Sequence, residues 1–169
     1  MALTPIAALM FSFAPDSALS KPELYRQLGD AAAAVIVREP DGVANMANIA
    51  ALIWQFVPGL NWAGFYRAIG DELVLGPFIG KPACLRIAFG EGVCGAAAAS
   101  LTTQLVADVG SFPGHIACDA DSRSELVVPV MRAGKLVAVI DLDSPEPARF
   151  DAADAAGIEA LAARIAAVI

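Results

Sequence analysis

Two apolar stretches separated by a very short connection most strongly limit the folds open to this chain. Residues 125–131 and 135–143 are rich in Val, Leu and Ile, and only 132–134 lie between them. Strands joined by so tight a turn pair antiparallel, because parallel strands need a crossover of a dozen or more residues. The hairpin therefore predicts an antiparallel sheet and disfavours a parallel doubly wound fold.

The turn of this hairpin allows two registers. A two-residue turn pairs Leu126 with Asp141. A three-residue loop, with Gly134 in the left-handed position, pairs Glu125 with Asp141 instead. We predict the three-residue loop, because Gly134 then lies where this loop type requires it and no Leu faces an isolated acid. Side chains alternate along a strand, so this register places Glu125, Asp141 and Asp143 on one face.

The remainder of the chain alternates helical and strand-like patterns, with tight turns between consecutive strands. Hydrophobic periodicity, capping residues and Pro or Gly breaks give the boundaries. The expected elements are helices over 21–38 and 42–57, strands over 61–68 and 72–78, a short strand over 85–87, a helix within 89–100, a turn with a short strand over 101–107, and a last helix capped by Asp151. This order predicts an α+β fold with helices mainly on one face of the sheet.

Length and the first residues suggest the domain organisation. A chain of 169 residues is expected to form one domain. Residues 1–20 are apolar, but they contain no Lys or Arg and are interrupted by Pro5 and Pro15, so a secretory signal is disfavoured. We expect an N-terminal extension over 1–20 and a single domain over 21–169.

Composition disfavours several classes of protein. The net charge is −7 and no basic run occurs, which argues against nucleic acid or an anionic membrane as partner. The chain has no run of about 18 apolar residues free of charge and Pro, so a membrane span is not expected. The three cysteines are an odd number without an export signal, so thiols in the cytoplasm are expected rather than a disulfide framework.

A loop rich in Gly, Pro, Ser and Asp precedes the hairpin and carries Cys118. Its glycines let the backbone approach a ligand, and a cysteine there is either a reactive thiolate or an inert buried residue. Glu125, Asp141 and Asp143 lie near the ends of the two strands that follow. One thiol facing three acids is an unusual combination, so we predict a functional site there.

Six motifs occur in order along the chain. They are NWAGFY (61–66), LGPFIGKPAC (75–84), FGEGVCG (89–95), FPGHIACD (112–119), SRSELVVPV (122–130) and IDLDSP (140–145). Together they closely resemble the free methionine-(R)-sulfoxide reductases, which are single GAF domains. The resemblance covers about Lys21 to Ile165, and its cysteine-bearing motifs are specific to that branch, whereas GAF domains in general are sensory modules. It implies a single GAF-like domain that reduces free L-methionine-(R)-sulfoxide to L-methionine.

The resemblance assigns the cysteines to a redox cycle. Cys118 is the expected nucleophile, which becomes a sulfenic acid, and Cys84 is the expected resolving thiol. Cys94 also matches a family cysteine, and it is either an alternative resolver or a small packed residue at a helix start. A Cys84–Cys118 disulfide would be released by a thioredoxin-type reductant. The wide cysteine spacing lacks the C-x₂₋₄-C pairing of structural zinc sites, so neither a metal nor a cofactor is expected.

The same resemblance implies a substrate chamber. Glu125, Asp141 and Asp143 match the acids that hold the α-ammonium group of the substrate, a role that suits clustered carboxylates. Crowding raises the pKa of at least one of them, and Glu125 or Asp143 is expected to donate a proton to the sulfoxide oxygen. Trp62 and Tyr66 share a strand face and resemble an aromatic wall around the S-methyl group, with a plain core role as the alternative.

The substrate's α-carboxylate has no obvious arginine partner in the sequence. The backbone N–H groups of Ile116, Ala117 and Cys118 are expected to bind it as an anion nest. His115, the single histidine, either favours the thiolate of Cys118 or is satisfied by backbone or water. A site that binds both the ammonium and the carboxylate would reject peptide-bound methionine, because the peptide lacks both free charges.

Two other functions stay open from the sequence. A GAF-type module could bind a small metabolite without catalysis, or the Cys84/Cys118 pair could act as a redox switch without turnover. The full cysteine set together with three acids favours the enzyme, because a pure sensor needs neither. The family's fold commonly pairs through helices, and the Ala-rich helices of this chain are compatible with a homodimer.

Overall fold

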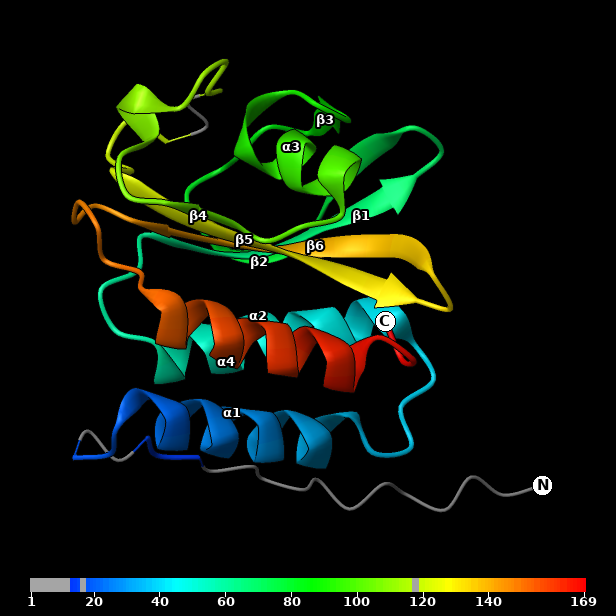
Figure 1. Cartoon of the computed structure of the whole chain (residues 1–169). Helices are drawn as coiled ribbons and strands as arrows, with labels where there is room; N and C mark the ends of the chain where they lie inside the picture. The colour runs from blue at the N-terminus through cyan, green and yellow to red at the C-terminus, as the bar shows by residue number, and fades with distance from the viewer. Residues whose placement is uncertain (1–12, 16–17, 117–118) are drawn as a thin grey trace.

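A six-stranded antiparallel sheet forms the centre of the molecule, with helices on both of its faces (Figure 1). The computed structural model describes residues 13–15, 18–116 and 119–169. In chain order the described elements are α1 (Lys21–Ile36), α2 (Gly42–Phe56), β1 (Trp62–Ile69), β2 (Glu72–Gly80), β3 (Arg86–Ala88), α3 (Gly92–Ser100), β4 (Gln104–Val106), a short 3₁₀ turn (Val109–Ser111), β5 (Ser124–Arg132), β6 (Lys135–Ser144) and α4 (Ala152–Ile165). The predicted elements are confirmed, with boundaries shifted by one to three residues.

The strand order is β3-β2-β1-β6-β5-β4, and each neighbouring pair is antiparallel. Tight turns join β1 to β2 and β5 to β6, as the sequence predicted. β1 and β6 pair at the centre, so the first and last long strands of the chain lie side by side. The α+β fold with an antiparallel sheet is therefore confirmed.

The helices divide unequally between the two faces (Figure 1). α2 and α4 pack against one face, and α1 lies outside them as a further layer. α3 covers the opposite face, together with β3 and the loop that leads to β5. The prediction of helices mainly on one face is confirmed, and α3 on the other face encloses a second, smaller core.

Side chains that alternate along the strands supply these two cores. On β1, Ala63 and Phe65 enter the main core against α2 and α4, whereas Trp62 and Tyr66 enter the core beneath α3. This division of β1 was predicted. On β5 and β6, the residues of the main core are Leu126, Val128, Val130, Ala138, Ile140 and Leu142.

Asp154 ties α1 to α4. It forms a capping box with the predicted cap Asp151, whose side chain accepts hydrogen bonds from the backbone N–H groups of Ala153 and Asp154. The Asp154 carboxylate also accepts hydrogen bonds from Tyr25 Oη at 2.8 Å and from Lys21 Nζ at 2.6 Å. One buried acid thus caps α4 and anchors the outer helix to it.

The turn between β5 and β6 differs from the predicted one. Arg132 pairs with Lys135, so the turn contains only Ala133 and Gly134, which have φ values of 50° and 76°. Both angles are left-handed, as in the type I′ turn whose twist matches that of a hairpin. The predicted three-residue loop is therefore wrong.

A β-bulge then changes the pairing of the acids. The register shifts between Val130 and Met131, so Glu125 pairs with Asp143. Both predicted pairings of Asp141 are wrong. The three acids nevertheless share one face, as predicted, because the bulge offsets the shorter turn.

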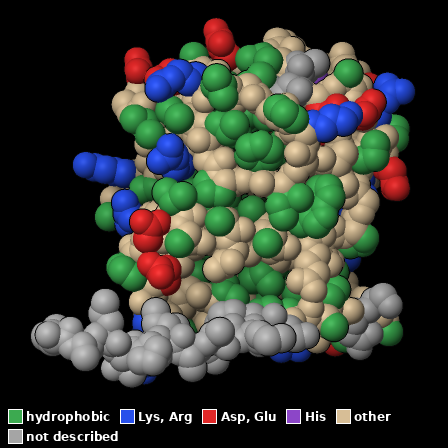
Figure 2. Space-filling model, turned by 180° about the vertical axis from the view of Figure 1, so that it is seen from behind, with side chains coloured by type: hydrophobic (Ala, Val, Ile, Leu, Met, Phe, Trp, Pro, Cys, Tyr) green, Lys and Arg blue, Asp and Glu red, His purple; other side chains and the backbone are tan. Residues whose placement is uncertain are grey.

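The molecular surface seen from behind carries scattered charge. In Figure 2, Lys and Arg side chains lie among hydrophobic and acidic ones and form no continuous basic patch on that face. Within the described part of the chain, no helix combines the length and the apolar character that crossing a bilayer requires. Most of the expected N-terminal extension, residues 1–20, lies outside the described residues, so this boundary stays a prediction.

Candidate functional site

A small cavity lies between α3 and the sheet, on the face opposite the main helices. It has a volume of about 30 Å³, which is space for roughly two water molecules and less than a whole amino acid occupies. The residues lining it are Tyr66, Ile87, Glu91, Gly92, Val93, Cys94, His115, Ile116, Asp119, Ser122, Glu125, Asp141 and Asp143. We call this space the chamber.

The three predicted acids meet at the floor of the chamber. Glu125 on β5 pairs with Asp143 on β6, and Asp141 lies two residues before Asp143 on the same face. Glu125 and Asp141 are each only 6% exposed. Across β1, Asp141 pairs with Gly64, which has no side chain to fill the space beside the carboxylate. The sheet therefore holds three carboxyl groups in a desolvated space.

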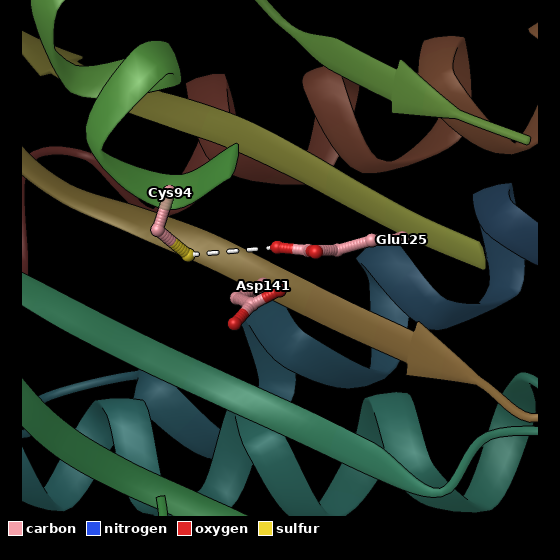
Figure 3. Close-up of side chains that lie close together, drawn as sticks. All are labelled: Cys94, Glu125 and Asp141. Atoms are coloured by element: carbon pink, nitrogen blue, oxygen red, sulfur yellow. Dashed lines mark hydrogen bonds between the residues drawn. The ribbon is translucent and has the colours of Figure 1, made fainter. Parts of the chain in front are cut away.

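Cys94 approaches these acids from α3. Its sulfur lies 3.9 Å from Glu125 Oε1, and Figure 3 shows the side chains of Cys94, Glu125 and Asp141 converging between the helix and the sheet. Cys94 is a buried free thiol. Asp141 Oδ1 is buried and has no hydrogen-bond partner among the described residues.

Burial shifts the protonation of the whole cluster. Desolvation raises the pKa of Asp141 to about 7, and the neighbouring polar groups of Cys94 and Glu125 only partly oppose this shift. Desolvation and the charge of Asp141 raise the pKa values of Glu125 and Asp143 well above the usual range of carboxyl groups. The pKa of the Cys94 thiol is also raised well above its usual value, first by burial and then by Asp141. Near neutral pH the empty chamber therefore holds protons rather than a full set of negative charges.

His115 lies at the wall of the chamber with Nε2 4.0 Å from Glu125 Oε2. Burial lowers the pKa of His115 and raises that of Glu125. Both shifts disfavour an ion pair between the two groups. The predicted link between His115 and the thiol of Cys118 stays a prediction, because residues 117–118 lie outside the described part of the chain.

Aromatic side chains line the far side of the acids, as predicted. Trp62 and Tyr66 stack with their ring centroids 5.8 Å apart, and Trp62 also stacks on Phe78 at 5.2 Å. The contact with Phe78 was not predicted. It depends on Gly64, because a Cβ at that position would overlap with Cβ of Phe78. Tyr66 lines the chamber itself, whereas Trp62 lines a smaller neighbouring cavity that Tyr66, Asp141 and Asp143 also border.

Asp119 is a site residue that the sequence analysis missed. Its side chain is only 6% exposed and accepts hydrogen bonds from Asn61 Nδ2 at 3.1 Å, from Lys81 Nζ at 3.1 Å and from the backbone N–H of Asp121 at 3.0 Å. These bonds, led by the one from Asp121, hold the pKa of Asp119 below its usual value. Asp119 therefore supplies a permanent negative charge to the chamber. Its position directly after Cys118 in the motif FPGHIACD was the available signal.

The structure places two of the three cysteines. Cys84 lies between β2 and β3 and is disulfide-bonded, whereas Cys94 is free. Cys118 and Ala117 lie outside the described residues, so their predicted roles are not tested. Ile116, the other residue of the predicted anion nest, lines the chamber and lies over Gly92 at the start of α3.

Comparison with known proteins agrees with this architecture. The GAF domain family matches residues 23–169. The chain belongs to the GAF domain family. This GAF domain is 42% identical to the free methionine-R-sulfoxide reductase of Escherichia coli (strain K12) over 89% of its own length and 92% of the relative's. The predicted resemblance is therefore confirmed.

Solved structures give the same result. A free methionine-R-sulfoxide reductase from Neisseria meningitidis, in complex with its substrate, is 43% identical to this GAF domain, with a TM-score of 0.87 over 93% of this chain and 95% of that one. A Burkholderia vietnamiensis protein described as a putative GAF sensor is 54% identical, with a TM-score of 0.86 over 89% of this chain and 96% of that one. The GAF fold thus extends over nearly the whole described chain.

Proposed function

We propose that this protein reduces free L-methionine-(R)-sulfoxide to L-methionine by thiol chemistry. The observation that carries the proposal is the chamber itself, in which buried Glu125 and Asp141, half-buried Asp143 and the ring of Tyr66 line one space within a GAF domain. Relatives at 42–44% identity that bear the name free methionine-R-sulfoxide reductase support the same activity. A role as a reductase also gives a use to a cysteine set that ligand binding alone does not need.

The chamber suits an amino acid with a free ammonium group. Asp141 and Asp143 are proposed to bind this group together with Glu125, since carboxylates form strong hydrogen bonds to a charged donor. Trp62 and Tyr66 are proposed to contact the S-methyl end of the substrate. The backbone N–H groups of Ile116, Ala117 and Cys118 are proposed to bind the α-carboxylate.

The proposed chemistry starts at Cys118. Its thiolate attacks the sulfoxide and Glu125 or Asp143 gives a proton to the oxygen; the S–O bond of the substrate breaks and an S–O bond to Cys118 forms, so methionine leaves and Cys118 holds a sulfenic acid. The raised pKa values of both acids support a protonated donor near neutral pH. The sulfoxide gains two electrons, and the Cys118 sulfur loses them.

The second step closes a disulfide. The thiol of Cys84 attacks the sulfenic sulfur, an S–S bond forms and water leaves with the oxygen. A thioredoxin-type dithiol then reduces this bond by exchange, so the net reaction consumes one dithiol and releases water. The disulfide at Cys84 and the narrow chamber support assignment of this conformation to the state after turnover.

Cys94 is the alternative resolving thiol. A cytoplasmic location and a homodimer are part of the same proposal.

A turnover assay tests this function. The protein is supplied with a dithiol reductant and with the R or the S epimer of free methionine sulfoxide, and the methionine formed is measured. We expect turnover of the R epimer by the wild type, none by Cys118→Ser, and none of peptide-bound methionine sulfoxide. Absence of turnover by the wild type would contradict the function, whereas activity of Cys118→Ser would contradict only the choice of nucleophile.

A non-catalytic sensor is the second candidate. Its support is the Burkholderia vietnamiensis relative described as a putative GAF sensor. A sensor predicts stoichiometric binding of methionine or its sulfoxide without turnover, and a thiol switch predicts reversible oxidation at Cys84 that substrate does not accelerate. The turnover assay therefore separates the enzyme from both alternatives, and measurements of ligand binding and of thiol oxidation separate the sensor from the switch.

A further inference from the structure

We propose that the chamber also binds a thiophilic divalent cation of the zinc type through Cys94, Glu125 and Asp141, and that this cation excludes the ammonium group of the substrate. The cation site rests on the geometry of the three side chains. Its competition with substrate rests on the proposed function. The two parts are therefore tested separately below.

The three side chains come from separate elements and meet at one point. Cys94 lies on α3, Glu125 on β5 and Asp141 on β6, and Figure 3 shows them turned toward one another. The thiol sulfur and one oxygen of each carboxyl group lie within 4.8 Å of one another, and all three residues are buried. Zinc bonds to sulfur and oxygen of about 2.0–2.3 Å would draw the three groups somewhat closer together. The sheet and α3 supply a rigid frame on which this adjustment is small.

Asp141 supplies an unpaired acceptor atom to this cluster. Its Oδ1 is buried without a hydrogen-bond partner among the described residues, although Asp141 as a whole is only 6% exposed. Buried polar atoms nearly always have a partner, so such an atom calls for an explanation. Asp141 lines the chamber, so a group bound there lies beside its carboxyl group. An acceptor oxygen beside a second carboxyl group favours a positively charged ligand.

The donor set selects the kind of cation. A sulfur ligand suits zinc and similar thiophilic ions, whereas magnesium and calcium prefer sites built entirely from oxygen. His115 adds a nitrogen at the same chamber, with Nε2 4.0 Å from Glu125 Oε2. Zinc sites use cysteine, histidine and carboxylate ligands in four-coordinate arrangements. The two carboxylates would suit an ammonium group as well as a metal ion, whereas the thiol favours the metal ion. Cys94 is therefore the residue to test.

Cadmium is the probe, because its bond to a thiolate absorbs in the ultraviolet. The full chain is reduced, freed of metal with a chelator, and titrated with Cd²⁺ while the charge-transfer absorption is recorded. We expect the absorption to saturate at one ion per chain, to vanish in Cys94→Ser and to persist in Cys84→Ser. An absorption that persists in Cys94→Ser, or one that does not saturate at one ion, would overturn the site.

A charge-matched pair of variants separates ligation from general attraction. Asp141→Asn removes a proposed ligand, and Glu91→Gln removes an exposed acid that also lines the chamber. We expect cadmium affinity to fall about tenfold or more in Asp141→Asn, since even partners outside the ligand shell change metal affinity by about 10–100-fold. Glu91→Gln is expected to stay within about threefold of the wild type. Equal losses in the two variants would overturn direct ligation.

Competition with free methionine tests whether the cation and the ammonium group of the substrate exclude each other. Methionine carries the same ammonium group as the proposed substrate, and alanine controls for metal binding by amino acids in solution. We expect methionine to remove the cadmium absorption at concentrations at which alanine has no effect. If methionine displaces no cadmium, competition is overturned while the cation site stands. If the Cys94-dependent absorption is present but the reductase assay shows no turnover, only the proposed function fails.

Discussion

Lys81 Nζ lies 3.1 Å from Asp119 Oδ1, and this ion pair joins the loop that carries Cys84 to the loop that carries Cys118. Asp119 also accepts a hydrogen bond from Asn61 Nδ2 at 3.1 Å, and Asn61 directly precedes β1. The two cysteine-bearing loops are therefore fixed to each other and to the sheet. In the proposed reaction the sulfurs of these loops must meet, so Lys81 and Asp119 are positioning residues for disulfide formation.

Replacement of Lys81 tests this role. Lys81→Met keeps the aliphatic part of the side chain and removes its charge. The side chain is 59% exposed, so solvent screens the pair, and we expect disulfide formation to slow by about two- to fivefold. The first release of methionine should keep its rate. Rapid-quench measurement of methionine and of free thiols in a single turnover distinguishes the two steps.

Arg164→Met is the matched control for that experiment. Arg164 pairs with Asp30 at 2.9 Å between α4 and α1, far along the chain from either loop, and it is also exposed. Its replacement should leave both steps unchanged. If Lys81→Met slows methionine release and disulfide formation equally, the ion pair has no specific part in bringing the thiols together.

Replacement of Asp154 is expected to lower the stability of the protein without changing its enzyme kinetics. It is 1% exposed and accepts hydrogen bonds from Lys21, Tyr25 and the backbone of Asp151. Asp154→Ala leaves the buried hydroxyl of Tyr25 without this partner, so we expect the free energy of unfolding to fall by about 2–3 kcal/mol. KM should not change, because Asp154 lies on the opposite side of the sheet from the chamber. Urea unfolding with steady-state kinetics checks both, and Asp154→Asn, which keeps an acceptor oxygen for Tyr25, should lose less stability.

The sequence predicted the sheet well because one face of each of the long strands β1, β5 and β6 enters the main core. Alternating apolar residues specify which side chains of β1 point toward α2 and α4, and tight turns specify antiparallel pairing. The register of β5 and β6 was not predictable in this way. Ala133 adopts a left-handed conformation that Ala disfavours, and the bulge at Val130 and Met131 depends on packing rather than on a local sequence signal.

The site was also predicted only in part. Motifs identified the acids and Tyr66, because their spacing along β1, β5 and β6 places them on one face of the sheet. Phe78 and Asp119 were missed because their roles depend on partners elsewhere in the chain. Phe78 reaches Trp62 only through the β1–β2 register at Gly64, and Asp119 lies in the chamber because Asn61 and Lys81 bind it. Contacts between distant loops leave no periodic pattern in a sequence.

Substrate binding should depend on pH through Asp141. Its pKa of about 7 reflects burial, and its neighbours in the chamber are Glu125, Asp143, Cys94 and His115. Below pH 7 the ammonium group must displace a proton, so we expect KM to fall as pH rises from about 6 to about 8, by at most about tenfold per unit. Asp141→Asn should raise KM at high pH and flatten this slope. Kinetics in buffers with a chelator measure both effects.

Asp119→Asn is the control for that pH dependence. Hydrogen bonds keep the pKa of Asp119 below its usual value, so this group stays ionised throughout the range. Its replacement should shift KM at all pH values without altering the slope. An unchanged slope in Asp141→Asn would assign the titration to another group of the chamber.

Through Asp141, the same burial is expected to lower the free energy of unfolding as pH rises. An acid whose pKa is higher in the folded than in the unfolded state stabilises the fold fully below its unfolded pKa, and this contribution is lost as pH rises through the folded value. For Asp141 the window runs from 3.8 to about 7. Asp141→Asn removes this titration, so we expect it to unfold less readily than the wild type at about pH 8, by on the order of 2 kcal/mol, and similarly to it near pH 4. Urea unfolding at both pH values measures the difference, with the exposed turn variant Asp71→Asn as control. The opposite result would be a free energy of unfolding that rises with pH in the wild type relative to Asp141→Asn. It would mean that the fold stabilises Asp141 as an anion, so that the chamber is charged before substrate binds.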